Sequence, residues 1–127
     1  QIDIIFLNKD ELKRLTNISV IENGVKKILK INNKIKIIAT NSENNVIYGD
    51  NESIIKIKPP KIKVKNENGA GDALAGMMLY LLSKGYNKEE ILKYSVACGS
   101  YYANGNRLSS KKDLLKIKNI SRRVKLK

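Results

Sequence analysis

With 127 residues, 42% of them hydrophobic, the chain is long enough to bury one small core. Its 25 lysines and arginines outnumber 12 acidic residues, for a formal net charge of +13. Most positive side chains are lysines spread along the whole chain among many isoleucines and asparagines, as AT-rich coding sequence favours, so the charge does not indicate nucleic-acid binding. The one concentrated basic run, residues 122–127, is expected to be a frayed, solvated terminus.

Single residue types narrow the chemistry further. Cys98 is the only cysteine in these residues, which excludes an intrachain disulfide among them and favours a reducing, cytoplasmic location. Histidine is absent, so carboxylates are left as the general bases. No apolar run is long enough to cross a bilayer, and no membrane association is expected.

The chain opens on an apolar run, residues 2–7, which is typical of a strand buried on both faces of a parallel sheet. Asn8 and Glu11 follow this strand directly. Open α/β sheets collect their ligands beyond the carboxyl ends of strands, so these polar side chains are placed for function. Alternatively, Asn8 caps a short helix that begins at Lys9, and Glu11 completes a capping box.

A helix is predicted over residues 17–32, with Ser19 as its N-cap and an apolar stripe facing the sheet. A second, mostly buried strand follows over residues 35–40, so strand, helix and strand predict a right-handed parallel crossover. Two short strands, residues 46–49 and 53–57, surround a turn at residues 50–52 and predict a hairpin.

The most informative stretch covers residues 62–83. Ile62 and Val64 alternate with lysines, which predicts a strand with one buried face. Apolar residues then recur at helical spacing from Asp72 to Ser83, and the helix is expected to end at Lys84-Gly85. A second helix is predicted from Lys88 or Glu89 through Tyr102, and a short last helix over residues 113–117. No internal repeat or domain boundary is recognised.

The turn between strand and helix reads Asn68-Gly69-Ala70-Gly71-Asp72. Glycines let backbone N–H groups converge at the start of a helix, where they are unpaired and the helix dipole is positive, an arrangement suited to a phosphate. Asp72 stands beside this anion site, where a carboxylate can accept the proton of an attacking hydroxyl. Alternatively, this is only a turn, with Asp72 as the helix cap.

The string Asn-x-Asn-Gly-Ala-Gly-Asp-Ala before an apolar helix resembles the second signature of the ribokinase-like, or PfkB, carbohydrate kinases. In that family the Gly-Ala-Gly-Asp loop is the anion hole and its aspartate the catalytic base. The resemblance assigns the anion hole to Gly69, Ala70 and Gly71 and the base to Asp72. Glu67 and Met77 depart from the family pattern on the packing side of the motif.

The resemblance covers about residues 2–106. Asn8 and Glu11 match the family's Asn-x-x-Glu element, which implies that they handle Mg²⁺ and phosphate, the cation being held through water. The loop after the second strand keeps Thr40 of the family's nucleotide loop but has Ser42 and Asn45 in place of glycines, and a plain hairpin loop stays an alternative. The implied ATP contacts are Thr40, Ser42, Asn68, Ala97, Tyr101 and Asn104. Ala97, Tyr101 and Asn104, with Cys98, would wall the adenine pocket, and ordinary packing is their alternative role.

The resemblance implies an α/β fold, a ribokinase-like three-layer sandwich with a mainly parallel central sheet. Because the family is roughly twice this length, residues 1–127 are expected to be the C-terminal ATP- and Mg²⁺-binding portion, without the N-terminal substrate-binding and lid part. Alone, this portion is expected to be inactive.

The implied function is ATP-dependent transfer of the γ-phosphoryl group to a hydroxyl of a sugar or nucleoside. Two alternatives remain: a nucleoside-specific member, such as an adenosine or pseudouridine kinase, and a non-catalytic basic module that binds RNA or a partner protein. The expected cofactors are ATP and Mg²⁺. The sequence leaves open whether a monovalent cation assists and whether the protein forms a homodimer.

Overall fold

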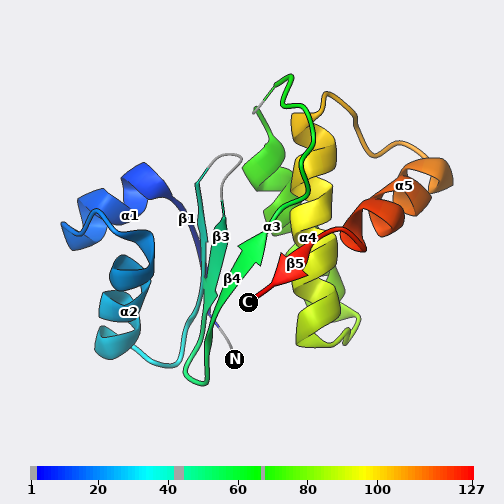
Figure 1. Ribbon diagram of the computed structural model, residues 1–127. Coiled ribbons are helices and arrows are strands. Elements are labelled where there is room, and N and C mark those ends of the chain that lie inside the picture. Colours follow the sequence, from blue (N-terminus) through cyan, green and yellow to red (C-terminus); the bar gives the residue numbers. More distant parts are fainter. Residues whose placement is uncertain (1–2, 42–44, 67) are drawn as a thin grey trace. The chain divides into compact units, whose positions relative to one another are not determined.

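A computed structural model describes residues 3–41, 45–66 and 68–127, and Figure 1 shows its strands and helices. These residues fall into two compact units: the described residues up to 56 together with residue 127, and the described residues from 57 to 126. The division lies inside strand β4 (Ile54–Lys58) and not in a linker. The expectation of one domain stays a prediction.

The first unit begins with β1 (Ile4–Asn8), α1 (Lys9–Thr16), α2 (Ile21–Ile31) and β2 (Lys36–Thr40). Strands β1 and β2 pair in parallel, with Ile4 opposite Lys36 and Asn8 opposite Thr40, which confirms the predicted parallel crossover. β1 is half-buried along most of its length and not buried on both faces as expected, because it is the first strand in the sheet order.

Strand β3 (Val46–Gly49) runs antiparallel to β2, with Ile38 opposite Tyr48. The predicted turn between β3 and β4 is also present: the Asp50 N–H donates to the Ser53 carbonyl at 3.0 Å. The buried Asp50 carboxylate accepts hydrogen bonds from the Tyr48 hydroxyl at 2.7 Å and from the Ser53 N–H at 2.9 Å.

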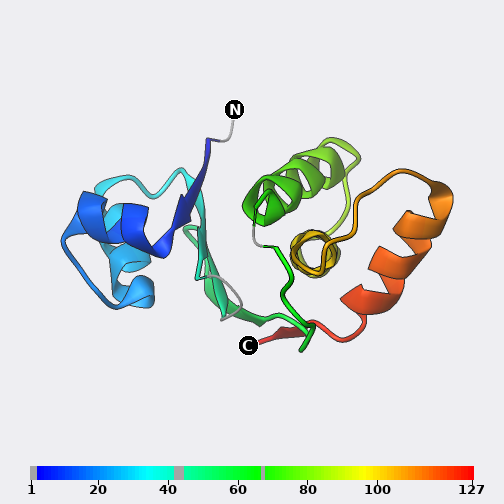
Figure 2. The same cartoon turned by 90° about the horizontal axis from the view of Figure 1, so that it is seen from above.

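Helices α1 and α2 lie on the same side of β1, β2 and β3 in both views (Figures 1 and 2). Val25 and Ile28 form the buried stripe of α2, three residues apart. The core of this unit combines that stripe with apolar side chains of α1, β2, β3 and the residue before β2, namely Leu12, Val25, Ile28, Ile35, Ile37, Ala39 and Ile47.

Ser19 does not cap α2. The helix begins at Ile21, with Val20 in the N-cap position and no side-chain cap hydrogen bond. Ser19 therefore lies one residue too early to reach the free N–H groups of the first turn. The preceding helix α1 is followed by its C-cap residue Asn17, which adopts the left-handed conformation with φ 58°. Asparagine tolerates this conformation better than most residues.

The second unit contains the end of β4, then α3 (Ala70–Ser83), α4 (Lys88–Ala103), α5 (Lys111–Ser121) and β5 (Lys125–Leu126). Helices α3 and α4 pack along one another, and α5 packs against α4 (Figures 1 and 2). Buried residues of α3 recur at helical spacing, at Leu74, Met78 and Leu81. Helix α5 is longer than predicted, since it covers 11 residues.

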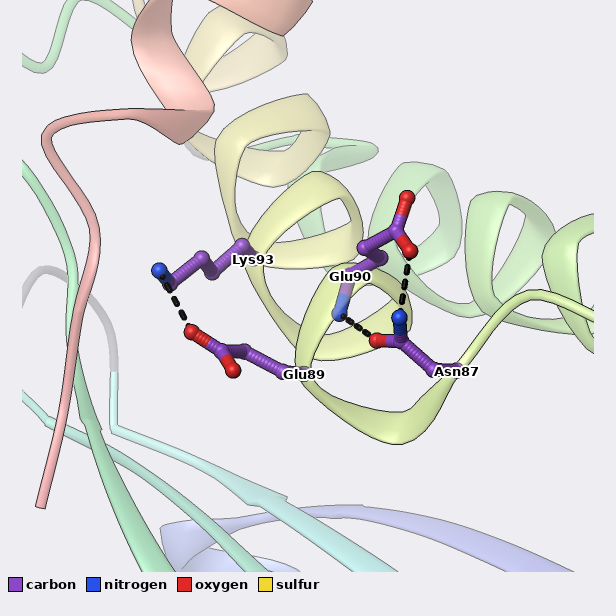
Figure 3. Close-up of polar contacts among 4 residues, drawn as sticks. All are labelled: Asn87, Glu89, Glu90 and Lys93. Carbon is purple, nitrogen blue, oxygen red and sulfur yellow. Dashed lines mark hydrogen bonds and ion pairs between the residues drawn. The ribbon is translucent and has the colours of Figure 1, made fainter.

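Helix α4 begins at Lys88, as predicted, and polar side chains fix its first turn (Figure 3). The Asn87 side-chain oxygen accepts the Glu90 N–H at 2.9 Å, which satisfies one of the free donors of the helix start. Glu89 and Lys93 form an ion pair at 2.9 Å, four residues apart on the same face. Both are solvent-accessible, so this pair contributes only about 0.3–0.5 kcal/mol.

The strand expected over residues 62–65 is wrong: residues 59–66 form no strand. The predicted alternation of burial is present, but the hydrogen bonds run elsewhere. The Lys65 N–H donates to the Ala103 carbonyl at 2.8 Å, and the Asn104 side-chain amide donates to the Lys63 carbonyl at 2.8 Å. This segment is therefore held by the end of α4 and not by a neighbouring strand.

The expected frayed terminus is wrong as well. Lys125 and Leu126 form β5, which pairs antiparallel with β4 through Ile57 and Lys58. Val124, only 3% exposed, precedes it. Apolar residues 124 and 126 alternate with basic residues, the period of a strand. With one parallel and two antiparallel pairings described, this part of the sheet is mixed.

Among the described residues, no helix is both long and apolar enough to cross a membrane.

Candidate active site

The Gly-Ala-Gly-Asp motif forms the start of α3. Gly69 is the N-cap residue and has a left-handed backbone, φ 83° and ψ −6°. A side chain at Gly69 would meet open space, so the backbone conformation and not packing requires glycine there. Ala70, Gly71 and Asp72 then form the first turn of the helix, whose N–H groups have no partner within the helix. This local geometry is compatible with the predicted anion site, and anion binding there stays a prediction.

Asp72 lies in this first turn with an exposed side chain. It is not the helix cap, because Gly69 holds that position, so the capping alternative is wrong. Within the described part of the chain, no hydrogen bond or ion pair to its carboxylate is found. A carboxylate beside free N–H groups combines a proton acceptor with an anion-binding turn.

Asn8, Glu11 and Thr40 come together at one edge of the first unit. Asn8 ends β1 and lies opposite Thr40, the last residue of β2. Asn8 and Glu11 also form the capping box: Asn8 Oδ1 accepts the Glu11 N–H at 2.8 Å, and Glu11 Oε1 accepts the Asn8 N–H at 2.9 Å. Ser42 lies outside the described residues, in the connection between the antiparallel neighbours β2 and β3.

The capping box leaves Glu11 Oε2 for other ligands. Both Glu11 and Asn8 are exposed at the carboxyl end of a strand. One free carboxylate oxygen fits the way proteins hold Mg²⁺, through few protein ligands, several waters and the phosphates of a substrate. Among the described residues, no group of three or more His, Cys, Asp or Glu side chains could hold a metal ion.

The candidate adenine contacts are mostly packed inside the second unit. Ala97 is fully buried, and Cys98 and Tyr101 are 3% and 4% exposed. Asn104 is half-buried and uses its side-chain amide to hold the Lys63 carbonyl at 2.8 Å. Asn68, beside the turn, is exposed. Packing inside the second unit accounts for Ala97, Cys98 and Tyr101. Contact with ATP stays a prediction for all of these residues, Asn68 included.

A network around Asp113 was not anticipated from the sequence. The Asp113 carboxylate accepts hydrogen bonds from the Tyr101 hydroxyl and from the N–H groups of Ser109 and Ser110, the latter two at 2.9 Å. These bonds hold the pKa of Asp113 well below its usual range, and the bond to Asp113 raises the pKa of Tyr101 to about 12. The network joins α4 to the start of α5. The Ser-x-x-Asp spacing of a helix start was its signal.

Gly99 of α4 was also missed. It is buried, and a Cβ built on it would lie 3.2 Å from the carbonyl oxygen of Ala70 and 3.4 Å from the Cβ of Leu74. Helix α4 therefore approaches α3 closely at the first turn of α3. A glycine inside a predicted helix is unfavourable for the helix itself, which was the available signal for a close approach.

The model of the pfkB family carbohydrate kinases matches residues 1–106. The chain belongs to this family. It is 27% identical over 123 residues to ATP-dependent 6-phosphofructokinase isozyme 2 of Escherichia coli strain K12, an alignment that covers 91% of this chain and 40% of that protein. The sequence resemblance to PfkB kinases is confirmed.

Two crystal structures of the family show the same fold. A "putative phosphofructokinase from Staphylococcus aureus" has a TM-score of 0.82 and 29% identity, over 98% of this chain and 41% of that one. Phosphofructokinase-2 of E. coli in complex with potassium has a TM-score of 0.80 and 24% identity, over 94% and 40%. The ribokinase-like α/β fold is therefore confirmed. The chain spans about two fifths of the length of these relatives.

Proposed function

We propose that the protein is an ATP-dependent kinase that transfers the γ-phosphoryl group to a hydroxyl of a sugar or sugar phosphate, as the phosphofructokinase relatives suggest. Residues 1–127 would supply the C-terminal ATP- and Mg²⁺-binding portion of the domain. The observation that carries the proposal is the left-handed turn at Gly69, which opens α3 with free N–H groups and places Asp72 in its first turn.

In the proposed reaction, the oxygen of the acceptor hydroxyl attacks the γ-phosphorus of ATP. The bond from that phosphorus to the β,γ-bridging oxygen breaks, and ADP leaves with the electron pair. Asp72 accepts the proton of the attacking hydroxyl. The N–H groups of the turn at Gly69–Gly71 donate to the oxygens of the transferred phosphoryl group, and they require no reorganisation because the helix start already holds them.

Asn8, Glu11 and Thr40, which come together at one edge of the first unit, would bind Mg²⁺ and the phosphates beside it. Asn8 and the free oxygen of Glu11 would bind its water shell, and Thr40 would lie beside the nucleotide phosphates. When bound, Mg²⁺ supplies charge neutralisation on these phosphates. The potassium complex of E. coli phosphofructokinase-2 supports a further role for a monovalent cation. A tetrameric inhibited form of that same enzyme supports self-association, and we propose at least a homodimer.

The test is a kinase assay of the full-length protein with MgATP against sugars, sugar phosphates and nucleosides. It compares wild type with Asp72→Asn and with Glu89→Gln, a matched control that neutralises another exposed carboxylate in the first turn of a helix. We expect one acceptor to be phosphorylated, and Asp72→Asn to lower kcat about 10²- to 10⁴-fold, the range for a general base. Glu89→Gln should keep the wild-type rate.

The other outcomes are equally clear. A nucleoside as the sole acceptor would move the protein to the nucleoside kinases. Equal rates for Asp72→Asn and Glu89→Gln would remove Asp72 as the base. A folded wild type that phosphorylates nothing on the panel, and instead binds RNA with strong salt dependence, would replace the kinase by the basic binding module.

A further inference from the structure

We infer that Gly99 is a positioning residue for the anion-binding turn: its missing side chain sets how closely α4 supports the first turn of α3. The inference rests on the proposed kinase function. The supporting contact is specific, because the atom nearest to a Cβ at Gly99 is the carbonyl oxygen of Ala70, at 3.2 Å. Ala70 is the middle residue of the Gly-Ala-Gly turn.

The obstructing atom cannot swing aside. A carbonyl oxygen is fixed by the backbone, and 3.2 Å is shorter than the 3.3–3.6 Å usual for a carbon beside a carbonyl oxygen. Leu74, on the next turn of α3, adds a second contact at 3.4 Å through its own Cβ, which is equally fixed to the backbone. A methyl group at Gly99 therefore moves the first turn of α3 and helix α4 apart by a few tenths of an ångström.

The movement falls on the turn and not on α4. Around Gly99, helix α4 is buried at Val96, Cys98 and Tyr101, each at most 4% exposed, and α5 packs against it. Close-packed interiors resist such shifts. The start of α3 is exposed at Gly71 and Asp72, and Gly69 has open space around it. The softer partner is the turn that carries the N–H groups.

A displaced turn weakens catalysis more than binding. Donors that stabilise charge in the transition state depend on their distance to the phosphoryl oxygens, and a misplacement of 1 Å can cost about 10²-fold in rate. For a few tenths of an ångström we expect Gly99→Ala to lower kcat by about three- to tenfold. The KM for ATP should change less than twofold, because among the proposed ATP contacts only Asn68 adjoins the turn.

Helix α3 offers a matched control. Gly76 is an exposed helical glycine, and a Cβ there meets nothing within 4 Å. Gly76→Ala makes the same chemical change and gains the same helix propensity as Gly99→Ala, without touching a neighbour. The experiment measures kcat and KM for wild-type full-length protein and both variants, together with amide chemical shifts of residues 70–72 in ¹⁵N-labelled protein.

We expect a lower kcat and shifted amide signals at Ala70, Gly71 and Asp72 for Gly99→Ala only. Equal kcat and unshifted signals in the two variants would overturn the inference, as would a Gly99→Ala protein that fails to fold, since a small adjustment at an exposed turn cannot unfold it. An inactive wild type would instead refute the proposed function. The amide shifts would then still decide whether Gly99 positions the turn.

Discussion

Gly49→Ala should destabilise the first unit by overpacking its core. A Cβ at Gly49 would lie 2.6 Å from Cγ1 of Val25, whereas two carbons in contact are about 3.5–4.0 Å apart. Val25 is completely buried in α2, and a β-branched side chain in a helix has one strongly preferred rotamer, so it cannot turn away. Either α2 or β3 must move by about 1 Å, a distance that follows from these contact radii.

Overpacking of this kind costs about 1–3 kcal/mol, and the rigid neighbour favours the upper half of that range. Alanine in a strand regains about 0.5–1 kcal/mol relative to glycine, which leaves a net loss of about 1–2.5 kcal/mol. At about 2–4 °C per kcal/mol, the value for larger domains, the thermal midpoint of the full-length protein should fall by about 2–10 °C. Calorimetry or thermal circular dichroism measures this change.

Two comparisons sharpen the test. Gly76→Ala, at an open helical position, should raise the midpoint slightly. In a double-mutant cycle, Gly49→Ala and Val25→Ala should cost less together than the sum of their separate effects, because each relieves the other. A Gly49→Ala protein as stable as wild type, or strict additivity in the cycle, would refute the overpacking argument.

Two further predictions concern titrating groups. Burial raises the pKa of the Cys98 thiol to about 11, so iodoacetamide at pH 8 should modify Cys98 only in denaturant and not in the folded protein. Peptide mass mapping would measure this, and modification of Cys98 in the folded protein would contradict its burial. The pKa of Tyr101 is raised to about 12 and that of Asp113 is lowered, so the hydrogen bond between them should stabilise the fold fully between about pH 4 and 10. This stabilisation should be lost as the pH rises from about 10 toward 12, where Tyr101 ionises, and as the pH falls below about 4, where Asp113 becomes protonated. Denaturant unfolding of Tyr101→Phe should show a weaker loss of stability than wild type at both extremes, and identical profiles would contradict this role for the bond.

Local patterns in the sequence predicted local structure well. Helix α4 starts at Lys88 because Asn87 supplies the cap, and β1 and β2 pair in parallel because a helical stretch separates two apolar runs. Other errors concern pairings between segments that are far apart in the sequence. Residues 62–65 alternate as a strand does, but their hydrogen-bond partners belong to the end of α4. Nothing in the sequence near residues 62–65 indicates this pairing.

In the candidate site, too, local features could be predicted from the sequence and contacts between distant residues could not. The glycine in the motif predicts the left-handed backbone seen at Gly69, since few other residues adopt it. Tyr101 shows the opposite case. Its helical spacing suggested either packing or a nucleotide contact, and only the folded chain shows that its hydroxyl binds Asp113, 12 residues away. Contacts that depend on where α5 packs could not be read from the spacing of α4 alone.

The hydrogen bonds of Lys63 and Lys65 with the end of α4 have a consequence for how the turn at Gly69–Gly71 holds its shape. They join Lys63 to Asn104, 41 residues along the chain, and Lys65 to Ala103, and so close a loop that contains α3 and α4. A side chain at Gly69 or Gly71 would meet nothing within 4 Å, and this turn lies between the closing hydrogen bonds and the body of α3. The turn can therefore shift by tenths of an ångström, but we expect it to unfold only when this whole loop opens, as one cooperative unit in hydrogen exchange.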